Sequence, residues 1–336
     1  MNGLKRRVTI KDVAASAGVS YQTVSRVIND HPDVAPETRE RVIEIIRNLD
    51  YRPSAIARSL VLERTRTLGL ITQDLSDYFF TQVIVGAERE ARKQGYVFVL
   101  GSTERNAQDE PAYLQLLLEH QIAGILFARP STERDQRHIK AIVERGLPLV
   151  TSAYHAEDLD LTVVDVDNID GGYWATRHLL EKEPAPVAMI TGPAGWRSVN
   201  ERTEGWRRAH AALGVKPGPV EQGDWSYESG YQTGRRLLKR APKLKAVFAQ
   251  NDRMAIAAIR AFRDAGRQVP QNIRVVGYDD VPEARYVHPS LTTMRQPMQE
   301  VGRIATQILV ETINGKQPEH REVLLKTELI VRESSS

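Results

Sequence analysis

The sequence of 336 residues predicts a small all-α module followed by a larger α/β body made of two doubly wound lobes. Two observations lead to this prediction. Residues 9–29, TIKDVAASAGVSYQTVSRVIN, have the pattern of two short helices separated by a tight turn. From residue 68 onward, short apolar runs alternate with helical stretches, as a parallel sheet requires, and this pattern runs through the chain twice.

The first two helices have local start and stop signals. Thr9 can cap a helix over residues 10–17, and Asp12, three positions later, completes a capping box. Gly18 ends this helix, and Ser20 can cap the next one. The spacing therefore predicts a helix–turn–helix.

The second helix has one apolar and one polar face. At about 100° per residue, Val24, Val27 and Ile28 share one side. The opposite side carries long polar side chains, namely Tyr21, Gln22, Ser25, Arg26 and Asn29. Arg can grip guanine and Gln can grip adenine, while Ser, Asn and Tyr reach phosphates, so this face suits the major groove of DNA. The pattern alone leaves open an ordinary amphipathic helix pair with a solvated outer face.

A third helix and a short segment complete the module. Pro36 suits the first turn of a helix that extends to about residue 48, with an apolar stripe of Val42, Ile45, Ile46 and Leu49. Residues 51–53, Tyr-Arg-Pro, break the pattern. Ser54 can cap a segment over residues 55–60 that is too short to be a stable helix alone.

The α/β body is expected to contain strands at residues 68–72, 97–101, 124–127, 149–151, 187–191, 220–222, 246–249 and 275–278. Helices are expected between them, including residues 80–94, 168–183, 198–213, 252–265 and 297–314. Ligands of such sheets lie beyond the carboxyl ends of the strands.

Side chains suited to a sugar follow these strands. Asn251 and Asp279 come directly after two of them, Trp225 follows a third, and Arg202 lies in the helix after a fourth. Carboxylate, amide and guanidinium groups pair with vicinal hydroxyls, and an indole can stack on the C–H face of a sugar. Structural roles stay open for each residue alone: Asp279 as a helix cap, Trp225 in the core and Arg202 in a surface ion pair.

Charge and composition exclude several classes of protein. Residues 1–66 hold 12 Lys and Arg against 8 Asp and Glu, whereas the remainder holds 34 against 35, so phosphate contact is expected at the N-terminal end. The absence of Cys excludes disulfides and Cys-based zinc sites. With neither a long apolar run nor a leader segment, a cytoplasmic protein without membrane contact is expected.

An enzyme is not expected. The chain has no Walker-type loop, no Gly-x-Ser-x-Gly elbow and no His cluster with metal spacing, so neither a cofactor nor a metal is predicted. Asp279 and Asp280 are adjacent on one loop, where two carboxylates cannot easily flank a glycosidic bond.

Residues 9–29 resemble, almost residue for residue, the N-terminal signature of the LacI/GalR family of transcriptional regulators. The resemblance covers the whole chain, including Gly-Tyr-Asp-Asp at 277–280, Leu-Thr-Thr at 291–293 and Leu-Ile-Val-Arg at 329–332. It implies a periplasmic-binding-protein-like core joined to the DNA-binding headpiece by a hinge helix that folds on the operator. Leu60 holds the position of the leucine that enters the minor groove. The alternative is a linker in which Leu60 packs on the body.

The resemblance also implies domain limits and site residues. The headpiece spans 1–52, the hinge helix and linker 53–66, the N-terminal lobe 67–166 plus 297–322, and the C-terminal lobe 167–296 plus 323–333, with crossings between lobes near 166, 296 and 322. The implied DNA contacts are Thr9, Ser20, Tyr21, Gln22, Thr23, Ser25, Arg26, Asn29, Thr38, Tyr51, Ser54, Ala57 and Leu60. The implied effector contacts are Asp74, Phe79, Arg202, Trp225, Asn251, Asp279 and Met298.

The function implied is that of a sugar-responsive repressor that binds a palindromic operator as a homodimer and is released by a saccharide. Within the family, Asn251 favours a saccharide over a nucleobase. Ala153 and Tyr154 stand where the family has an acidic ligand, and Met298 stands at an aromatic position, so the particular sugar stays open. Ligand-strengthened DNA binding and a sugar-binding transport protein are the alternatives. A dimer is expected in place of a tetramer because the sequence stops at 334–336 without a leucine heptad tail.

Overall fold

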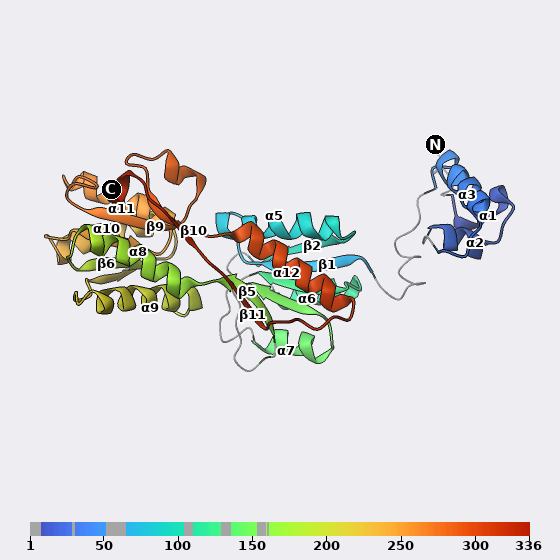
Figure 1. Cartoon of the computed structure of the whole chain (residues 1–336), viewed down its shortest axis with the longest axis horizontal. Coiled ribbons are helices and arrows are strands. Elements are labelled where there is room, and N and C mark those ends of the chain that lie inside the picture. The colour runs from blue at the N-terminus through green and yellow to red at the C-terminus, as the bar shows by residue number, and fades with distance from the viewer. Residues whose placement is uncertain are drawn as a thin grey trace. The chain divides into compact units, whose positions relative to one another are not determined.

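The computed structural model describes residues 8–28, 31–51, 65–103, 110–128, 136–152, 159 and 161–336. The chain divides into two compact units, Met1–Thr65 and Arg66–Ser336, shown in Figure 1. Several positions predicted above lie outside the described residues, namely Asn29, the segment 55–60 with Ser54, Ala57 and Leu60, and the pair Ala153 and Tyr154.

The N-terminal unit is a three-helix module, and its predicted helices are confirmed. They are α1 (Ile10–Ala17), α2 (Tyr21–Ile28) and α3 (Pro36–Asn48). Thr9 and Asp12 form the predicted capping box, and Gly18 ends α1 with a φ of 64°. Val13, Val24 and Val42, one from each helix, are fully buried and hold the module together.

The N-terminal lobe of the second unit is built on a six-stranded sheet of order β11-β5-β4-β3-β1-β2 in which the paired strands are parallel. The strands are β1 (Thr67–Thr72), β2 (Val97–Ser102), β3 (Gly124–Ala128), β4 (Leu149–Ser152), β5 (Thr162–Val166) and β11 (Glu322–Leu325). The helices are α5 (Tyr78–Lys93), α6 (Glu110–Glu119), α7 (Gln136–Glu144) and α12 (Met298–Ile313). Helices α5 and α12 pack closely because Gly86 and Gly302 carry no Cβ, which would come within 1.9 and 2.0 Å of backbone oxygens of the partner helix.

The C-terminal lobe has a second six-stranded sheet, of order β12-β10-β9-β8-β6-β7, in which only β12 runs antiparallel to its neighbour. The strands are β6 (Val187–Thr191), β7 (Val220–Gln222), β8 (Ala246–Ala249), β9 (Arg274–Asp279), β10 (Thr292–Arg295) and β12 (Glu328–Ile330). The helices are α8 (Asn168–Lys182), α9 (Arg197–Ala212), α10 (Tyr227–Arg240) and α11 (Asp252–Asp264). Figure 1 shows the two lobes side by side, joined by segments that run between them.

The chain passes between the lobes after β5, after β10 and after β11. The third passage corrects the predicted limit at residue 322. Strand β11, Glu322–Leu325, pairs with β5 and therefore belongs to the N-terminal lobe, so the passage falls at Lys326 and Thr327. All eight predicted strands are confirmed to within a residue at either end, whereas β5, β10, β11 and β12 were not among them.

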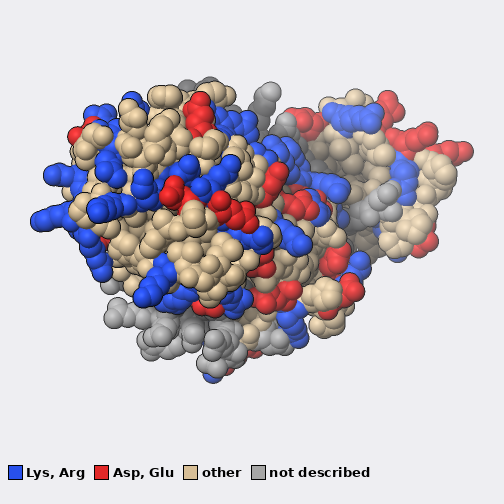
Figure 2. All heavy atoms as spheres, turned by 60° about the vertical axis from the view of Figure 1, so that its left-hand side comes forward, with Lys and Arg blue, Asp and Glu red and all other residues tan. Residues whose placement is uncertain are grey.

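The surface of the C-terminal lobe carries many Lys and Arg side chains interspersed with Asp and Glu, as Figure 2 shows. Several of these cations are in exposed ion pairs, such as Arg236 with Glu221 at 2.8 Å and Arg260 with Asp264 at 2.8 Å. Such pairs add little stability. Within the described parts of the chain, no helix has the length and apolar content that crossing a membrane needs.

Candidate functional site

Helix α2 presents the polar face that the sequence predicts. Tyr21 is 55% exposed, and Gln22 and Arg26 are also exposed, whereas Val24 and Val27 are buried beneath them. Ser25 is half-buried on the same helix. The long side chains of this face are therefore available to a molecule outside the module.

The smaller predicted DNA contacts lie at helix ends of the same module. The hydroxyl of Thr9 donates to Asp12 Oδ2 at 2.7 Å, and the backbone N–H of Thr23 donates to Ser20 Oγ at 3.1 Å. Thr38 lies in the first turn of α3, and Tyr51 follows α3 and packs against the core of the module. The hydroxyls of Thr9 and Ser20 thus hold the geometry of the starts of α1 and α2, and helix starts are where phosphates commonly bind.

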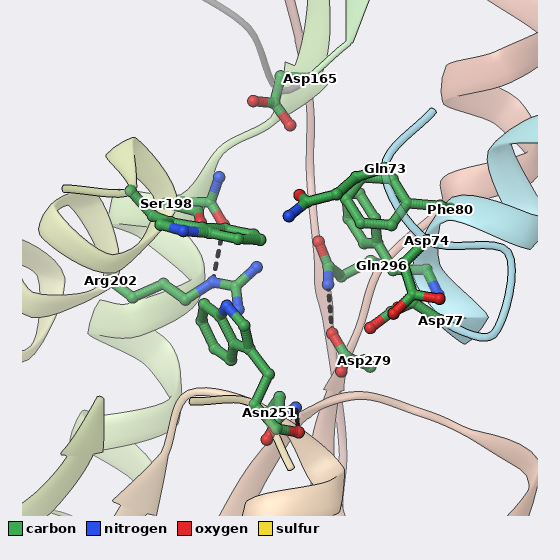
Figure 3. Close-up of a pocket in the computed structure, with 14 residues that line it drawn as sticks. Gln73, Asp74, Asp77, Phe80, Asp165, Ser198, Arg202, Asn251, Asp279 and Gln296 are labelled. Atoms are coloured by element: carbon green, nitrogen blue, oxygen red, sulfur yellow. Dashed lines mark hydrogen bonds between the residues drawn. The ribbon is translucent and has the colours of Figure 1, made fainter. Parts of the chain in front are cut away.

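A cavity lies between the two lobes of the second unit, at the carboxyl ends of strands from both sheets, with about 750 Å³ of empty space counted out to its opening. Its lining residues are Gln73, Asp74, Asp77, Phe79, Phe80, Asp165, Asn168, Trp196, Ser198, Arg202, Trp225, Asn251, Asp279 and Gln296. Figure 3 shows Asp165 at one end, Asn251 and Asp279 at the other, and Arg202 and Gln73 facing each other from opposite lobes.

Arg202 is held rigidly in the second turn of α9. Its Nε donates to Asn168 Oδ1 at 2.8 Å, its Nη1 donates to the carbonyl of Gln250, and its guanidinium lies 3.7 Å from the ring centre of Tyr278. The residue is only 5% exposed. The alternative of a surface ion pair is therefore excluded for Arg202, which lines the cavity as predicted.

Two indoles line the C-terminal side of the cavity. Trp225 adopts a φ of 75°, in the left-handed region that is costly for a large side chain. Gly192 makes room for its ring, because a Cβ there would lie 2.0 Å from Trp225 Cζ2. The second indole, Trp196, lies 5.4 Å from the first between ring centres, with the planes at 59°. Trp225 Nε1 is buried and has no hydrogen-bond partner among the described residues.

Asn251 has a structural role beside its place in the cavity. It caps α11, because its Oδ1 accepts from Met254 N at 2.9 Å, and its Nδ2 donates to the carbonyl of Trp225 at 3.0 Å. One amide thus ties the loop that carries Trp225 to the start of α11. The amide has a second N–H that these bonds do not use.

Two consecutive residues with positive φ place the carboxylates after β9. Asp279 has a φ of 129° and Asp280 a φ of 57°. Asp279 lines the cavity and accepts from Gln296 Nε2 at 2.6 Å, whereas Asp280 turns toward Arg295 and Arg332. The strained turn sends the two side chains to different partners.

The electrostatics of these carboxyls differ. Burial raises the pKa of Asp279 well above its ordinary value, and the nearby Asp252 raises it further, against the effect of Arg202. Burial likewise raises the pKa of Asp252 to about 7, although hydrogen bonds from Thr293 and Val281 oppose it. Burial acts in the same direction on Asp280, but its hydrogen bonds with Arg332 and Arg295 outweigh it and lower the pKa.

The N-terminal lobe contributes polar groups through the loop after β1. Asp74 and Asp77 line the cavity, but each also accepts from loop backbone: Asp74 from Ser76 N at 2.8 Å and Asp77 from Phe79 N at 2.9 Å. Gln73 Oε1 and Gln296 Oε1 are buried without a hydrogen-bond partner among the described residues. Together with Trp225 Nε1, the residues that line the cavity therefore hold three polar atoms whose hydrogen-bonding capacity the described residues leave unused.

The structure brings together six of the seven predicted effector residues, namely Asp74, Phe79, Arg202, Trp225, Asn251 and Asp279. Met298 does not line this cavity. It is the first residue of α12 and packs, 5% exposed, into the core of the N-terminal lobe, whereas Gln296, two residues earlier, lines the cavity. Beyond the seven predicted contacts, the lining includes Gln73, Asp77, Phe80, Asp165, Asn168, Trp196, Ser198 and Gln296. Gln73 directly follows β1, so the rule that found Asn251 could have found it.

A helix–turn–helix module followed by a two-lobed α/β core with a polar and aromatic cavity defines the class of DNA-binding regulators that carry their own ligand sensor. The comparisons agree with this class. Residues 9–54 match the model of the lacI family of bacterial regulatory proteins, and residues 176–335 match that of the periplasmic binding protein-like domain.

The relatives extend over the full chain. The HTH-type transcriptional regulator CelR of Thermobifida fusca is 37% identical over 98% of this chain and 99% of its own. The HTH-type transcriptional repressor PurR of Aliivibrio fischeri (strain MJ11) is 37% identical over 97% of this chain and 98% of its own. The chain therefore belongs to the LacI family and is a transcriptional regulator.

Solved structures show the same architecture. A CelR–cellobiose complex is similar with a TM-score of 0.75 and 34% identity, covering 98% of this chain and 100% of that one. The Lac repressor dimer bound to operator and the anti-inducer ONPF is similar with a TM-score of 0.90 and 28% identity, covering 98% and 99%. The predicted fold class is confirmed.

Proposed function

We propose that this regulator is a repressor that a saccharide releases from its operator. The observation that carries the proposal is the cavity, which places the guanidinium of Arg202, the carboxyl of Asp279 and the indole of Trp225 around one space between the lobes. Charged groups that pair with vicinal hydroxyls and an aromatic face that stacks on C–H bonds suit a sugar. The solved complexes of CelR with cellobiose and of Lac repressor with operator support this assignment.

On the DNA side, Gln22 and Arg26 read base edges from the exposed face of α2, and Tyr21, Ser25 and Asn29 contact phosphates. Thr9, Ser20, Thr23, Thr38 and Tyr51 support these contacts from the ends of the three helices. In this proposal Ser54, Ala57 and Leu60 belong to a hinge segment that inserts Leu60 into the minor groove at the centre of a palindromic site. A homodimer supplies the two half-site modules.

Release requires that the saccharide favour one arrangement of the lobes over another, because only differential affinity shifts an equilibrium. In this proposal, Gln296 couples the bound sugar to the arrangement of the lobes. It lies on the passage between β10 and α12, and it already donates to Asp279 in the cavity. A ligand held by Asp279 and Gln296 therefore acts on a segment that joins the lobes.

Binding and not catalysis is the proposed role of the carboxylates. Asp279 faces the cavity and Asp280 faces two guanidinium groups, so this adjacent pair cannot flank a glycosidic bond. Among the described residues there is also no group of acidic or His side chains arranged to hold a metal ion.

A thermal-shift screen of the full-length protein against monosaccharides, disaccharides and purine bases tests the ligand class. A saccharide that binds the folded state raises the melting temperature, whereas a response to purines alone contradicts the assignment. An operator-binding titration with and without the active saccharide then gives the sign of the response. Weaker operator binding in the presence of sugar is expected, and stronger binding would reveal corepressor logic.

A further inference from the structure

Two glycines in one loop serve the two indoles of the cavity. Gly192 leaves space for the ring of Trp225, as described above, and Gly195 adopts a φ of 89° that a side chain would strain. That turn delivers Trp196 directly in front of α9. The loop after β6 is thus shaped around both aromatic side chains.

Trp196 occupies a position at the start of a helix that other residue types stabilise better. It is the N-cap of α9, yet it makes no side-chain capping hydrogen bond. Ser, Thr, Asp and Asn are strongly preferred at an N-cap, because their oxygens accept from the first turn. A residue that departs from this capping preference without stabilising the helix is expected to be present for a functional reason.

The geometry of the two indoles excludes a sandwich. Stacked faces lie about 3.5–4 Å apart, so one ring held between two indoles needs about 7–8 Å between them. The ring centres of Trp196 and Trp225 are only 5.4 Å apart and the planes meet at 59°. Each indole can therefore serve a different ring of the bound molecule.

The two indoles also differ in depth and in neighbours. Trp225 is 8% exposed, and its carbonyl accepts from Asn251, which Figure 3 shows at the end of the cavity opposite Asp165. Trp196 is half-buried and lies two residues before Ser198, which Figure 3 shows on the Asp165 side of Arg202. The aromatic surfaces thus follow one another along the cavity.

We propose that the cavity binds a saccharide of at least two rings, with Trp225 stacked on the inner ring and Trp196 on the next. This inference rests on the proposed saccharide ligand. It makes Trp196 the residue that distinguishes an oligosaccharide from a monosaccharide. The inner ring takes the polar contacts of Arg202 and Asp279, and the second ring extends toward Asp165.

Calorimetric titrations of the full-length protein test the proposal with glucose, galactose, mannose and xylose and with cellobiose, maltose, lactose, mannobiose and xylobiose. We expect at least one disaccharide to bind at least about tenfold more tightly than its component monosaccharides. Trp196→Ala should remove that advantage, because it weakens disaccharide binding far more than monosaccharide binding. Trp196→Phe, which keeps an aromatic face, should restore most of it.

Trp174→Ala is the matched control, because Trp174 is a 43% exposed indole of the same lobe that does not line the cavity. It should change neither affinity. The inference is overturned if a monosaccharide binds as tightly as every disaccharide that contains it, or if Trp196→Ala weakens both sizes of ligand equally. If no saccharide in the series binds, the proposed saccharide ligand itself has failed.

Discussion

Arg253 and Asp77 link the two lobes. Arg253, in the first turn of α11, places Nη1 3.8 Å from Asp77 Oδ2 and donates from Nη2 to the carbonyl of Ser76 at 2.7 Å. Both side chains of the ion pair are 23% exposed, so solvent screens it only in part. Asp77 also lines the cavity, which places this contact beside the proposed ligand.

Replacing Arg253 with Met should loosen this contact, because Met keeps the aliphatic stem but loses both polar interactions. We expect the bound saccharide to dissociate up to about fivefold faster, as the loss of about 1 kcal/mol implies. Stopped-flow Trp fluorescence measures the rate. Arg260→Met is the control, because Arg260 pairs within α11 with Asp264. An unchanged dissociation rate in the Arg253 variant would show that the link does not restrain the lobes.

Asp279→Asn should separate ligand binding from DNA binding. The variant keeps the shape of the side chain but replaces the carboxyl with an amide, so saccharide affinity should fall about 10- to 100-fold while operator affinity without sugar stays unchanged. Calorimetry and an operator shift assay measure the two affinities. The exposed Asp264→Asn should behave as wild type. Normal release of operator by sugar in the Asp279 variant would refute its place in the ligand site.

Arg26→Ala should relax sequence preference. If Arg26 hydrogen-bonds a guanine, its loss weakens binding to the preferred operator by roughly 1–3 kcal/mol and removes the base preference at one position. Binding-site selection with wild-type and variant protein measures this directly. Arg41→Ala, which removes an exposed Arg from α3, should leave the preference intact. Equal weakening on operator and random DNA would mean that Arg26 contacts phosphate only.

The stability of the C-terminal lobe should depend on pH through Asp252. Its pKa is raised to about 7 in the folded protein from an ordinary 3.8, so the folded state holds a proton that the unfolded state has lost between these values. The stabilisation that this proton provides is fully present below the ordinary pKa of 3.8 and is lost as the pH rises through about 7. The free energy of unfolding falls by at most about 1.4 kcal/mol per pH unit in this range. His178 and His210, whose pKa values are lowered by burial, act in the opposite direction as the pH falls.

Asp252→Asn isolates this effect, because an amide can accept from Val281 N–H and donate to Thr293 Oγ1. The variant should lose less stability than wild type between pH 5 and about pH 7. The four Trp residues all lie in the C-terminal lobe, so their fluorescence during urea unfolding at several pH values reports on that lobe. Parallel stability curves for the two proteins would contradict the assignment of the proton to Asp252.

The headpiece was predictable from sequence because its signals are local. Thr9, Asp12 and Gly18 define the ends of α1 within ten residues of one another. Strands β11 and β12 were harder to predict, because each is paired with a strand that is distant in sequence. The burial of Glu322–Leu325 is weak and alternating, and only its pairing with β5 identifies it as part of the N-terminal lobe.

The cavity was predictable where a side chain lies at or just beyond the end of a strand, as Asp279 and Asn251 show. Trp196 escaped the prediction because it lies five residues beyond β6, in a loop whose path depends on Gly195. Met298 was predicted as an effector contact from the family resemblance, which does not fix the rotation of a helix. In the structure, the start of α12 turns that side chain into the core.

Because the chain passes between the lobes three times, the headpiece and the two lobes can fold only in a fixed order during synthesis. The headpiece is contiguous and can fold as soon as its residues leave the ribosome. The N-terminal lobe needs α12 and β11, so it stays unfinished until residue 325 has been made, and the C-terminal lobe needs β12. A nascent chain therefore acquires its DNA-reading helix long before it acquires either half of its sensor. Truncations that remove β11 and β12 should leave a module that reads DNA without control by sugar.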